Sequence, residues 1–293
     1  MKKNIFLLFL LMLASCKSSE ITAQNDVDIQ VVLLAGQSNM AGAGNFDELE
    51  SNIINRIQKI SDRVSLVFNG KLIKPLSYYD NKPSEKYNFT KRFGPELLMG
   101  LTLAENNPTK KYLLIKRSQG GTALYGAWNP NWSSEKAQAI EKDKKQKLQL
   151  FSMHIEDIQK SLAILKSEEK TYKIIGLAWM QGENDATLIE AARSYASNLK
   201  ALILKYRTIF KEEKMPFVIG EINSRYGVKD GAKIVRNQME SFVNKTHFTA
   251  LIKTSTNQNW LDYPKHKDNV HYNTEGQVKL GTAFAFELMK MIK

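Results

Sequence analysis

Cysteine is almost absent from this sequence, because Cys16 is the single one among 293 residues. No disulfide can form within the chain, and no zinc site built from cysteines is possible. A long hydrophobic run is also lacking: the apolar stretch at 5–14 is shorter than the roughly twenty residues that a membrane-spanning helix needs. With a mean hydropathy of -0.37, the composition excludes a protein with several membrane spans.

Signals for nucleic-acid binding are missing too. The sequence contains neither an arginine-rich helix nor a strand pattern that interleaves aromatic and basic residues. It does carry 42 Lys and Arg against 30 Asp and Glu, a formal net charge of +12. Such a charge can steer an anionic partner, although a lysine-rich solvated surface is the simpler explanation. We therefore expect no nucleic-acid partner.

The overall composition is that of a folded soluble protein, with 43% apolar and 25% charged residues. We find no internal repeat, and no linker rich in Pro, Gly or Ser follows residue 26. The length suits one large domain of the α/β type. We therefore predict a single domain over 27–293.

The first residues have the features of an export signal. Two lysines precede the apolar run at 5–14, whose length suits the core of a signal peptide. The run ends in Leu-Ala-Ser-Cys16, which resembles a bacterial lipobox, in which the cysteine is lipidated. We predict a signal peptide over 1–15, a lipidated cysteine and tether over 16–26, and an exported lipoprotein of the bacterial cell envelope that contacts the membrane by its lipid anchor only. An ordinary secretory signal with an accidental cysteine is the alternative.

The remaining sequence alternates apolar runs with amphipathic stretches. Strands spaced by helices imply βαβ units, so we predict an α/β fold with a mostly parallel sheet and helices on both faces. Residues 45–92 lack a regular period, and we expect them to form a surface excursion near the site. The predicted strands are 29–34, 112–116, 174–179, 216–220 and 248–252, and the predicted helices are about 94–106, 135–167, 187–211, 231–245 and 274–292.

Ligands bind beyond the carboxyl ends of the strands in open α/β sheets, so we expect the functional residues to lie just after each strand. The first predicted strand ends in a turn that carries Ser38 among small residues. A serine at such a turn exposes its hydroxyl and directs nearby N–H groups to one point, as a nucleophile requires. A helix N-cap is the structural alternative. Met40 stands where the α/β-hydrolase elbow has its second glycine, so that motif is absent.

Two further strand ends carry small or polar residues. Gly120 and Gly121 follow one predicted strand, and paired glycines let a backbone N–H approach a ligand closely. Gln181 and Glu183 follow the next predicted strand. Both precede the residues that would cap the following helix, so capping does not explain them.

One of the four histidines has an acidic partner at a suitable spacing. Asp268 precedes His271 by three residues, so it can turn back and accept the imidazole Nδ1–H. That bond fixes the tautomer and stabilises the imidazolium, as a serine-hydrolase triad requires. We predict a structural role for His154, in an amphipathic stretch, and place His247 at a helix end. His266 is the local competitor but lacks such an aspartate.

Together these motifs resemble the SGNH hydrolase superfamily, and within it the carbohydrate acetylesterases of the acetylxylan esterase and sialate O-acetylesterase group. They occur in the family's order and span residues 29–281. The matching blocks are Gly36-Gln37-Ser38-Asn39-Met40, Gly94-Pro95-Glu96-Leu97, Lys116 with Gly120-Gly121-Thr122 and Trp128, Trp179-x-Gln181-Gly182-Glu183-x-Asp185, and Asp268-x-x-His271 with Gly276.

The resemblance implies a three-layer α/β/α, flavodoxin-like fold and a serine esterase. It implies Ser38 as nucleophile, His271 as general base and acid, and Asp268 as the residue that orients the histidine. The group needs neither a metal nor an organic cofactor. Gln37, Asn39, Glu183 and Asp185 would support the site, with Glu183 holding the neighbouring loops or buttressing the histidine.

The resemblance also implies an oxyanion hole. It would combine the backbone N–H groups of Ser38 and Gly121 with one side-chain amide. The acetylesterase branch points to Gln181, which we favour, whereas the wider superfamily points to Asn184.

The implied activity is removal of O-acetyl groups from carbohydrates. The single-domain length favours xylan-type substrates, with O-acetylated sialic acid as the alternative. Trp128, Tyr125 and Trp260 lie near motif-bearing strand ends and are candidates to stack on sugar rings, although core packing is the structural alternative. A glycan-binding surface lipoprotein without turnover is a hypothesis of another class, against which the intact serine, histidine and aspartate argue.

Overall fold

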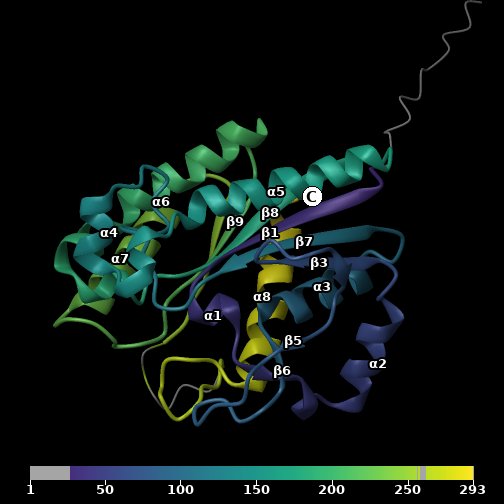
Figure 1. The fold of residues 1–293 in the computed structure, drawn as a ribbon, viewed down its shortest axis with the longest axis horizontal. Coiled ribbons are helices and arrows are strands. Elements are labelled where there is room, and N and C mark those ends of the chain that lie inside the picture. The colour runs from purple at the N-terminus through teal and green to yellow at the C-terminus, as the bar shows by residue number, and fades with distance from the viewer. Residues whose placement is uncertain (1–26, 256, 258–261, 293) are drawn as a thin grey trace, which may run out of the picture.

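The computed structural model describes residues 27–255, 257 and 262–292, and its arrangement is shown in Figure 1. A seven-stranded sheet forms the centre, and its strands run parallel except β4, which pairs antiparallel with β3. A separate three-stranded antiparallel sheet lies beside it. The central order is β10 (Thr249–Ile252), β9 (Phe217–Gly220), β8 (Tyr172–Met180), β1 (Ile29–Gly36), β7 (Lys111–Ser118), β3 (Val64–Phe68) and β4 (Lys74–Pro75), and the small sheet joins β2 (Gly44–Asn45), β6 (Lys91–Phe93) and β5 (Tyr79–Asp80).

Helices cover both faces of the central sheet, which confirms the predicted three-layer α/β/α fold. One face packs against α5 (Leu150–Ser167), α6 (Ile189–Phe210) and α7 (Gly231–Val243), and the other against α2 (Ser51–Lys59), α3 (Pro95–Asn106) and α8 (Thr274–Met291). The short helices are α1 (Ser38–Ala41), α4 (Ser134–Ile140) and the 3-10 turns η1 (Phe46–Glu48), η2 (Asp143–Lys147) and η3 (Asp185–Thr187).

The central strand β1 explains why the sheet needs two helical layers. Val31, Leu33 and Ala35 belong to the core cluster shared with α5, α6 and α7. Val32 and Leu34, which alternate with them, belong to the cluster shared with α3 and α8. A parallel strand buried on both faces is a continuous apolar run, which is the pattern that predicted this strand.

The predicted helix over 135–167 is wrong in one respect, because the structure breaks it into α4, η2 and α5. Glu141 and Lys142 have extended backbone between the first two elements, and Asp143 has a φ of 50°. The break leaves the Glu141 carboxylate free to accept hydrogen bonds from the backbone N–H groups of Ala123 and Ala127 at 2.8 and 2.9 Å. Helical amphipathicity alone does not reveal this requirement.

The segment 45–92 is only partly the surface excursion that we expect from its sequence. It also contains β3, which joins the central sheet by pairing in parallel with β7. With five residues, β3 is too short to give a strong periodic signal.

The predicted signal peptide, the tether with Cys16, and Trp260 lie outside the described residues. Within the described ranges, none of the helices combines the length and the apolar character that crossing a bilayer demands.

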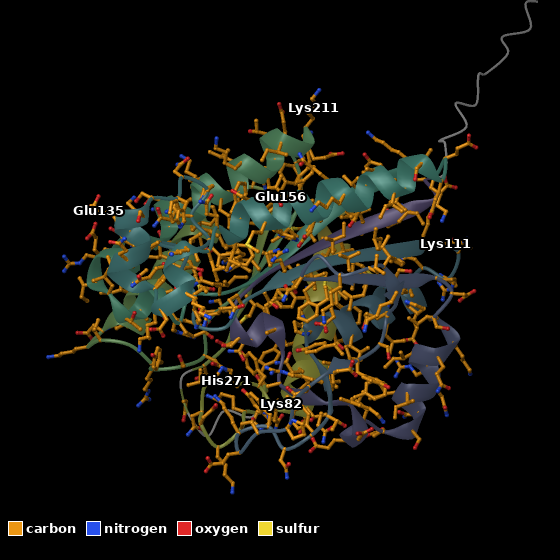
Figure 2. All side chains as sticks on the ribbon, in the orientation of Figure 1. Lys82, Lys111, Glu135, Glu156, Lys211 and His271 are labelled. Carbon is orange, nitrogen blue, oxygen red and sulfur yellow. The ribbon has the colours of Figure 1, made fainter. Side chains whose placement is uncertain are left out.

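The order of the sheet brings three strand ends together. The register pairs Gly36, the last residue of β1, with Ser118 of β7 and Met180 of β8. The residues that follow these three strands therefore meet at one edge. His271 lies on this side of the molecule, whereas Lys111, at the start of β7, lies away from it (Figure 2).

Candidate active site

Ser38 sits at the junction of β1 and α1 and is partly exposed. The approach to β8 here is so close that a Cβ at Gly36 would lie 2.1 Å from the carbonyl oxygen of Met180. The loop after β7 adjoins the serine, since a Cβ added at Gly120 would lie 3.5 Å from the Ser38 Cβ. The structure therefore brings the predicted nucleophile beside the predicted glycine pair.

His271 and Asp268 form the predicted pair. The imidazole Nδ1 lies 2.7 Å from Asp268 Oδ2. The other carboxylate oxygen, Oδ1, accepts the backbone N–H groups of Val270 and His271, both at 2.9 Å. Both carboxylate oxygens therefore bond to the loop that carries His271, which fixes the carboxylate relative to the ring.

The protonation of this pair suits a general base. Partial burial raises the pKa of Asp268, but the hydrogen bonds from the two backbone N–H groups and from the Lys86 and His271 side chains outweigh it, so its pKa lies well below the usual range. Burial lowers the pKa of His271, and the Asp268 bond only partly opposes that effect. At neutral pH the aspartate is charged and the imidazole is neutral.

Asn39 ties the serine turn to the histidine loop. Its Nδ2 donates to the carbonyl oxygen of Val270 at 3.0 Å, and its Oδ1 accepts the backbone N–H of Tyr272 at 3.2 Å. Asn39, which follows Ser38, therefore forms hydrogen bonds to both neighbours of His271. In the described part of the chain Ser38 Oγ itself has no hydrogen-bond partner, and Asn39 provides a polar link between the serine turn and the histidine loop.

Glu183 holds Asn39 in turn. Its Oε1 accepts Asn39 Nδ2 at 2.8 Å. The carboxyl group is buried, and burial raises its pKa above the ordinary value. Of the two roles that the resemblance leaves open, this contact favours holding the neighbouring turns, because Glu183 reaches the histidine only through Asn39.

The other histidines have different environments. His154 is buried in α5, where its ring nitrogens lie 2.7 Å from the hydroxyl of Tyr206 and 3.2 Å from the carbonyl oxygen of Ile115. Burial lowers its pKa to about 4, so it is a neutral core residue, as predicted. His266 Nε2 lies 2.9 Å from the carbonyl oxygen of Ala43.

The prediction of Gln181 as the oxyanion donor does not fit the geometry. Its side chain is fully buried, and Nε2 faces Asp185 Oδ2 at 2.6 Å and the Thr122 carbonyl oxygen at 3.0 Å. Both amide hydrogens therefore have protein acceptors. A buried carboxylate next to an amide takes the donors that a substrate would need.

Gln37 has the free donor instead. Its Oε1 accepts the backbone N–H of Asn184 at 3.3 Å, which identifies the oxygen end of the amide, and Gln181 Nε2 lies 3.2 Å from the same oxygen. Among the described residues its Nε2 has no partner, and the same holds for the backbone N–H groups of Ser38 and Gly121. The alternative donor, the Asn184 side chain, faces Glu141 Oε2 at 3.4 Å.

Two buried carboxylates hold the loop that contains Gly121. Asp185 accepts the backbone N–H groups of Leu124 and Tyr125 at 2.8 and 2.9 Å. Glu141 binds the same loop on either side of these residues. Gly121 itself has a φ of 62°, a left-handed conformation that favours glycine. The N–H of Gly121 is thus presented by a loop with little freedom.

Sequence reasoning missed three charged residues here. Glu141 lies within a predicted helix, and Lys86 lies in the irregular segment 45–92, so neither has a local signal. Lys116 is in the matched blocks, but the sequence gives no indication of its role. Its fully buried ammonium group pairs with Glu96 and donates to the carbonyl oxygen of Ala41, the last residue of α1, at 3.2 Å.

Two of the aromatic residues predicted to stack on sugar rings are buried. Trp128 is 0% exposed and packs against Trp179 with 5.3 Å between ring centroids. Tyr125 is 6% exposed, and its hydroxyl donates to Glu190 at 2.7 Å. Both rings belong to the packed interior of this side of the sheet, so neither offers a face to a substrate.

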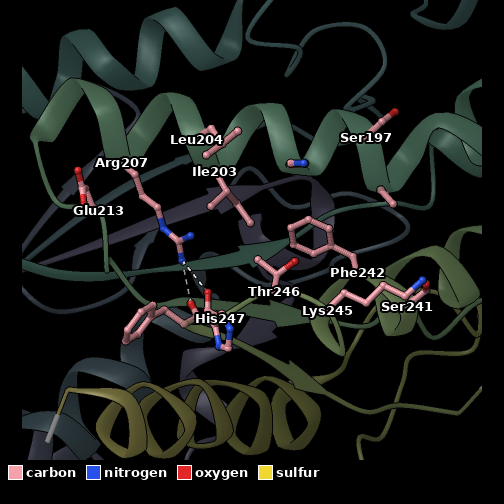
Figure 3. A pocket seen from close by; sticks show the side chains of 13 residues that line it. Ser197, Ile203, Leu204, Arg207, Glu213, Ser241, Phe242, Lys245, Thr246 and His247 are labelled. Atoms are coloured by element: carbon pink, nitrogen blue, oxygen red, sulfur yellow. Dashed lines mark hydrogen bonds between the residues drawn. The ribbon is translucent and has the colours of Figure 1, made fainter.

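A hollow with a volume of about 670 Å³ lies at the amino end of β10, between α6 and the end of α7. Figure 3 shows Arg207 in it, donating to the carbonyl oxygens of His247 and Phe248 at 3.2 Å. No predicted catalytic residue lines this hollow. In the part of the chain that the structure describes, no group of three or more His, Cys, Asp or Glu side chains is placed to hold a metal ion.

A strand-end serine, an adjacent His–Asp pair and free N–H donors, gathered at the carboxyl edge of a three-layer sheet, characterise the class of ester hydrolases. Comparison with protein families makes the assignment specific. The chain belongs to the carbohydrate esterase family of sialic acid-specific acetylesterases, whose family model matches residues 28–290. The protein is therefore a carbohydrate O-acetylesterase.

Solved structures share the fold. A protein from Arabidopsis thaliana has 20% identity and a TM-score of 0.64, covering 90% of this chain and 99% of that one. NanS has 13% identity and a TM-score of 0.60, covering 89% and 97%. A carbohydrate acetylesterase from Xanthomonas citri has 15% identity and a TM-score of 0.59, covering 90% and 56%. A comparison with curated protein sequences found no match.

Proposed function

We propose that the chain removes O-acetyl groups from carbohydrates through an acyl-enzyme formed on Ser38. His271 Nε2 takes the serine proton as Oγ attacks the acetyl carbonyl, and Asp268 stabilises the resulting imidazolium. The N–H groups of Ser38 and Gly121 and the amide of Gln37 receive the oxyanion. His271 then protonates the departing sugar oxygen and activates the water that releases acetate.

The Asn39 bridge is the observation that supports this proposal most strongly. A serine acting only as a helix cap would have no need of a neighbour that bonds both sides of a histidine loop more than 200 residues away in the chain (231 and 233 positions). That histidine also carries the 2.7 Å bond to Asp268. Asn39, the neighbour of Ser38, is thus joined by polar contacts to the loop that carries the His271–Asp268 pair.

The test is acetate release by wild type and by Ser38→Ala, Asp268→Asn and His266→Ala. We expect Ser38→Ala to lose at least a thousandfold in kcat and Asp268→Asn to lose heavily, with His266→Ala close to wild type. Activity that depends on His266 but not on Asp268 would overturn the assignment of the base. A folded wild type that binds glycans but releases no acetate from any ester would favour the non-catalytic binding protein.

The substrate belongs to the same proposal. The length of the chain favours xylan-type esters, but two of the aromatic residues expected to stack on a neutral sugar are buried. A pocket of about 300 Å³ borders Asp268, and Arg225 and Lys265 line it. These cations favour an acidic sugar such as O-acetylated sialic acid. Parallel assays on acetylated xylan oligomers and O-acetyl sialic acid decide between the two substrates. Long-chain acyl esters in the same assays test for a lipase, for which little activity is expected.

We also propose that the mature protein is a lipoprotein of the bacterial cell envelope, anchored through Cys16. β1 has eight residues, so the point where the chain enters the sheet lies about 26 Å from the serine turn. An anchor at that end leaves the site free for substrate. Mass analysis of the mature protein tests the proposal: a lipidated Cys16 is expected, and an unmodified, freely secreted chain contradicts it.

A further inference from the structure

Lys86 makes close contact with the His–Asp pair. Its Nζ lies 2.9 Å from Asp268 Oδ2 and 3.1 Å from His271 Nδ1. The same Asp268 oxygen accepts the imidazole at 2.7 Å. One carboxylate oxygen is therefore shared between a lysine and the histidine.

The loop that carries Lys86 is held in place. Asn81 closes it, with its backbone N–H donating to the carbonyl oxygen of Thr90 and its Nδ2 donating to that of Phe89, both at 2.7 Å. The Tyr87 ring meets the His271 ring edge-on at 6.3 Å between centroids. Lys86 is thus presented to the pair by a closed loop that also packs on the histidine.

The contact has a chemical consequence. An ammonium group has no lone pair, so with Nδ1–H bonded to Asp268 the lysine cannot hydrogen-bond to Nδ1 and acts as a charge. When His271 accepts the serine proton, two cations lie beside one carboxylate. The lysine makes the imidazolium a stronger acid and keeps the ring neutral at lower pH.

We propose that Lys86 is a positioning residue that shares Asp268 with His271 and thereby sets the pH range in which His271 acts as a base. This inference rests on the proposed function, in which His271 is that base. It goes beyond it, because neither the triad nor the oxyanion hole requires a lysine.

The other charged groups around the pair either oppose this effect or act without a direct bond. Asp268 stabilises the protonated ring, whereas Arg92, on β6, disfavours it as Lys86 does but without bonding to it. Lys265 interacts with Asp268 through its charge alone. The guanidinium of Arg92 lies over the Tyr87 ring at 4.7 Å from its centroid. Lys86 is the cation in direct contact with the pair within the described ranges.

The test compares the pH dependence of kcat/KM for wild type, Lys86→Met and Lys86→Arg. Without the cation, the acid limb of Lys86→Met should move to higher pH, so that below the wild-type midpoint its kcat/KM is roughly three- to tenfold lower. The plateau at high pH should change much less, and Lys86→Arg should restore the limb. Because the Lys86 side chain is 49% exposed, high salt should shrink the difference between wild type and Lys86→Met.

Lys82→Met is the matched control, because Lys82 is an exposed lysine of the same loop that contacts neither Asp268 nor His271 among the described residues. The second readout is the NMR titration of the His271 imidazole, which does not depend on turnover. A shifted titration in Lys86→Met shows that Lys86 sets the protonation of His271 even if wild type releases no acetate, and in that case the failure lies with the proposed function. Superimposed titrations and pH profiles in an active enzyme overturn the inference, as does a uniform loss of activity at every pH.

Discussion

Gln37 and Gln181 carry the same amide, yet only one of them has hydrogens to spare. Gln181 gives its hydrogens to buried acceptors, one of which is the carboxylate of Asp185. Gln37 uses its oxygen toward the protein and leaves its nitrogen free beside Ser38. Availability of a donor, rather than its presence in a motif, decides which residue can bind an oxyanion.

Gln37→Glu tests this assignment, because it keeps the oxygen that accepts from Asn184 and replaces the free donor with an acceptor. We expect kcat to fall by about 100- to 1000-fold, the usual cost of losing one oxyanion donor. Acetate release measured beside a thermal melt separates this loss from unfolding. A variant with near wild-type kcat would show that Gln37 does not contact the oxyanion.

At this scale some of the proposed site residues can be inferred from the sequence and others cannot. Ser38, Asp268 and His271 stand in short motifs whose chemistry depends on local spacing. The choice between Gln37 and Gln181 depends on Asp185 and on the carbonyl of Thr122, which only the fold brings near. Lys86 acts from a loop without a motif, so no pattern in its neighbourhood indicates a role.

The loop between β7 and α4 is held by carboxylates that it does not itself contain. Asp185 is the more informative of the two, because burial raises its pKa to about 7 against the hydrogen bonds from Gln181, Leu124 and Tyr125. In the unfolded chain an ordinary aspartate has a pKa of about 4. Between these values the folded state binds more protons than the unfolded state.

The contribution of Asp185 to the free energy of unfolding should therefore be largest below about pH 4 and should fall as the pH rises through about 7. Asp185→Asn removes this dependence. Urea unfolding at pH 5 and pH 8 should show wild type losing roughly 2–4 kcal/mol more than the variant between the two conditions. Equal losses of unfolding free energy in the two proteins would mean that Asp185 is charged at both pH values. Comparing the change between the two pH values, rather than the absolute stabilities, cancels any packing defect of the variant.

The buried Lys116–Glu96 pair joins β7, the first turn of α3 and the end of α1. Lys116→Met leaves a buried carboxylate without its partner, and we expect a loss of about 3–5 kcal/mol in unfolding free energy. The double variant Lys116→Met, Glu96→Gln should recover much of it, since no uncompensated charge remains. Denaturant unfolding of both variants checks this, and an additive double variant would argue against a coupled pair.

Elements were predictable where their signal is local. β1, β7 and β8 are buried on both faces and stand out as apolar runs, and α3 and α8 end close to their predicted limits. The break after α4 was not predictable, because it depends on a contact between Glu141 and a loop that precedes it. β3 was not predicted for a different reason. A strand this short is stabilised by its pairing with β7 and has no strong pattern in its own sequence.

Across the whole molecule, the site and the entry of the chain into the sheet lie at opposite edges. The described contacts of the site involve residues between Gly36 and Gln277, and none comes from the amino end of β1. A chain of residues 27–293 should therefore match the unlipidated chain of residues 16–293 in kcat/KM on a soluble acetylated sugar. Side-by-side kinetics test this, and a marked loss in the shorter chain would assign residues 16–26 a part in substrate binding.

Val27, Met291 and Ile292 line one common hollow at the amino ends of the strands. The two ends of the described chain are thus neighbours, and a short linker can join them. A circularly permuted chain, opened at an exposed turn elsewhere, should keep Ser38, His271 and Asp268 in place. For use as a biocatalyst, the enzyme can be attached to a bead or fused to a carbohydrate-binding module through either end, with Ser38 still turned toward the solution.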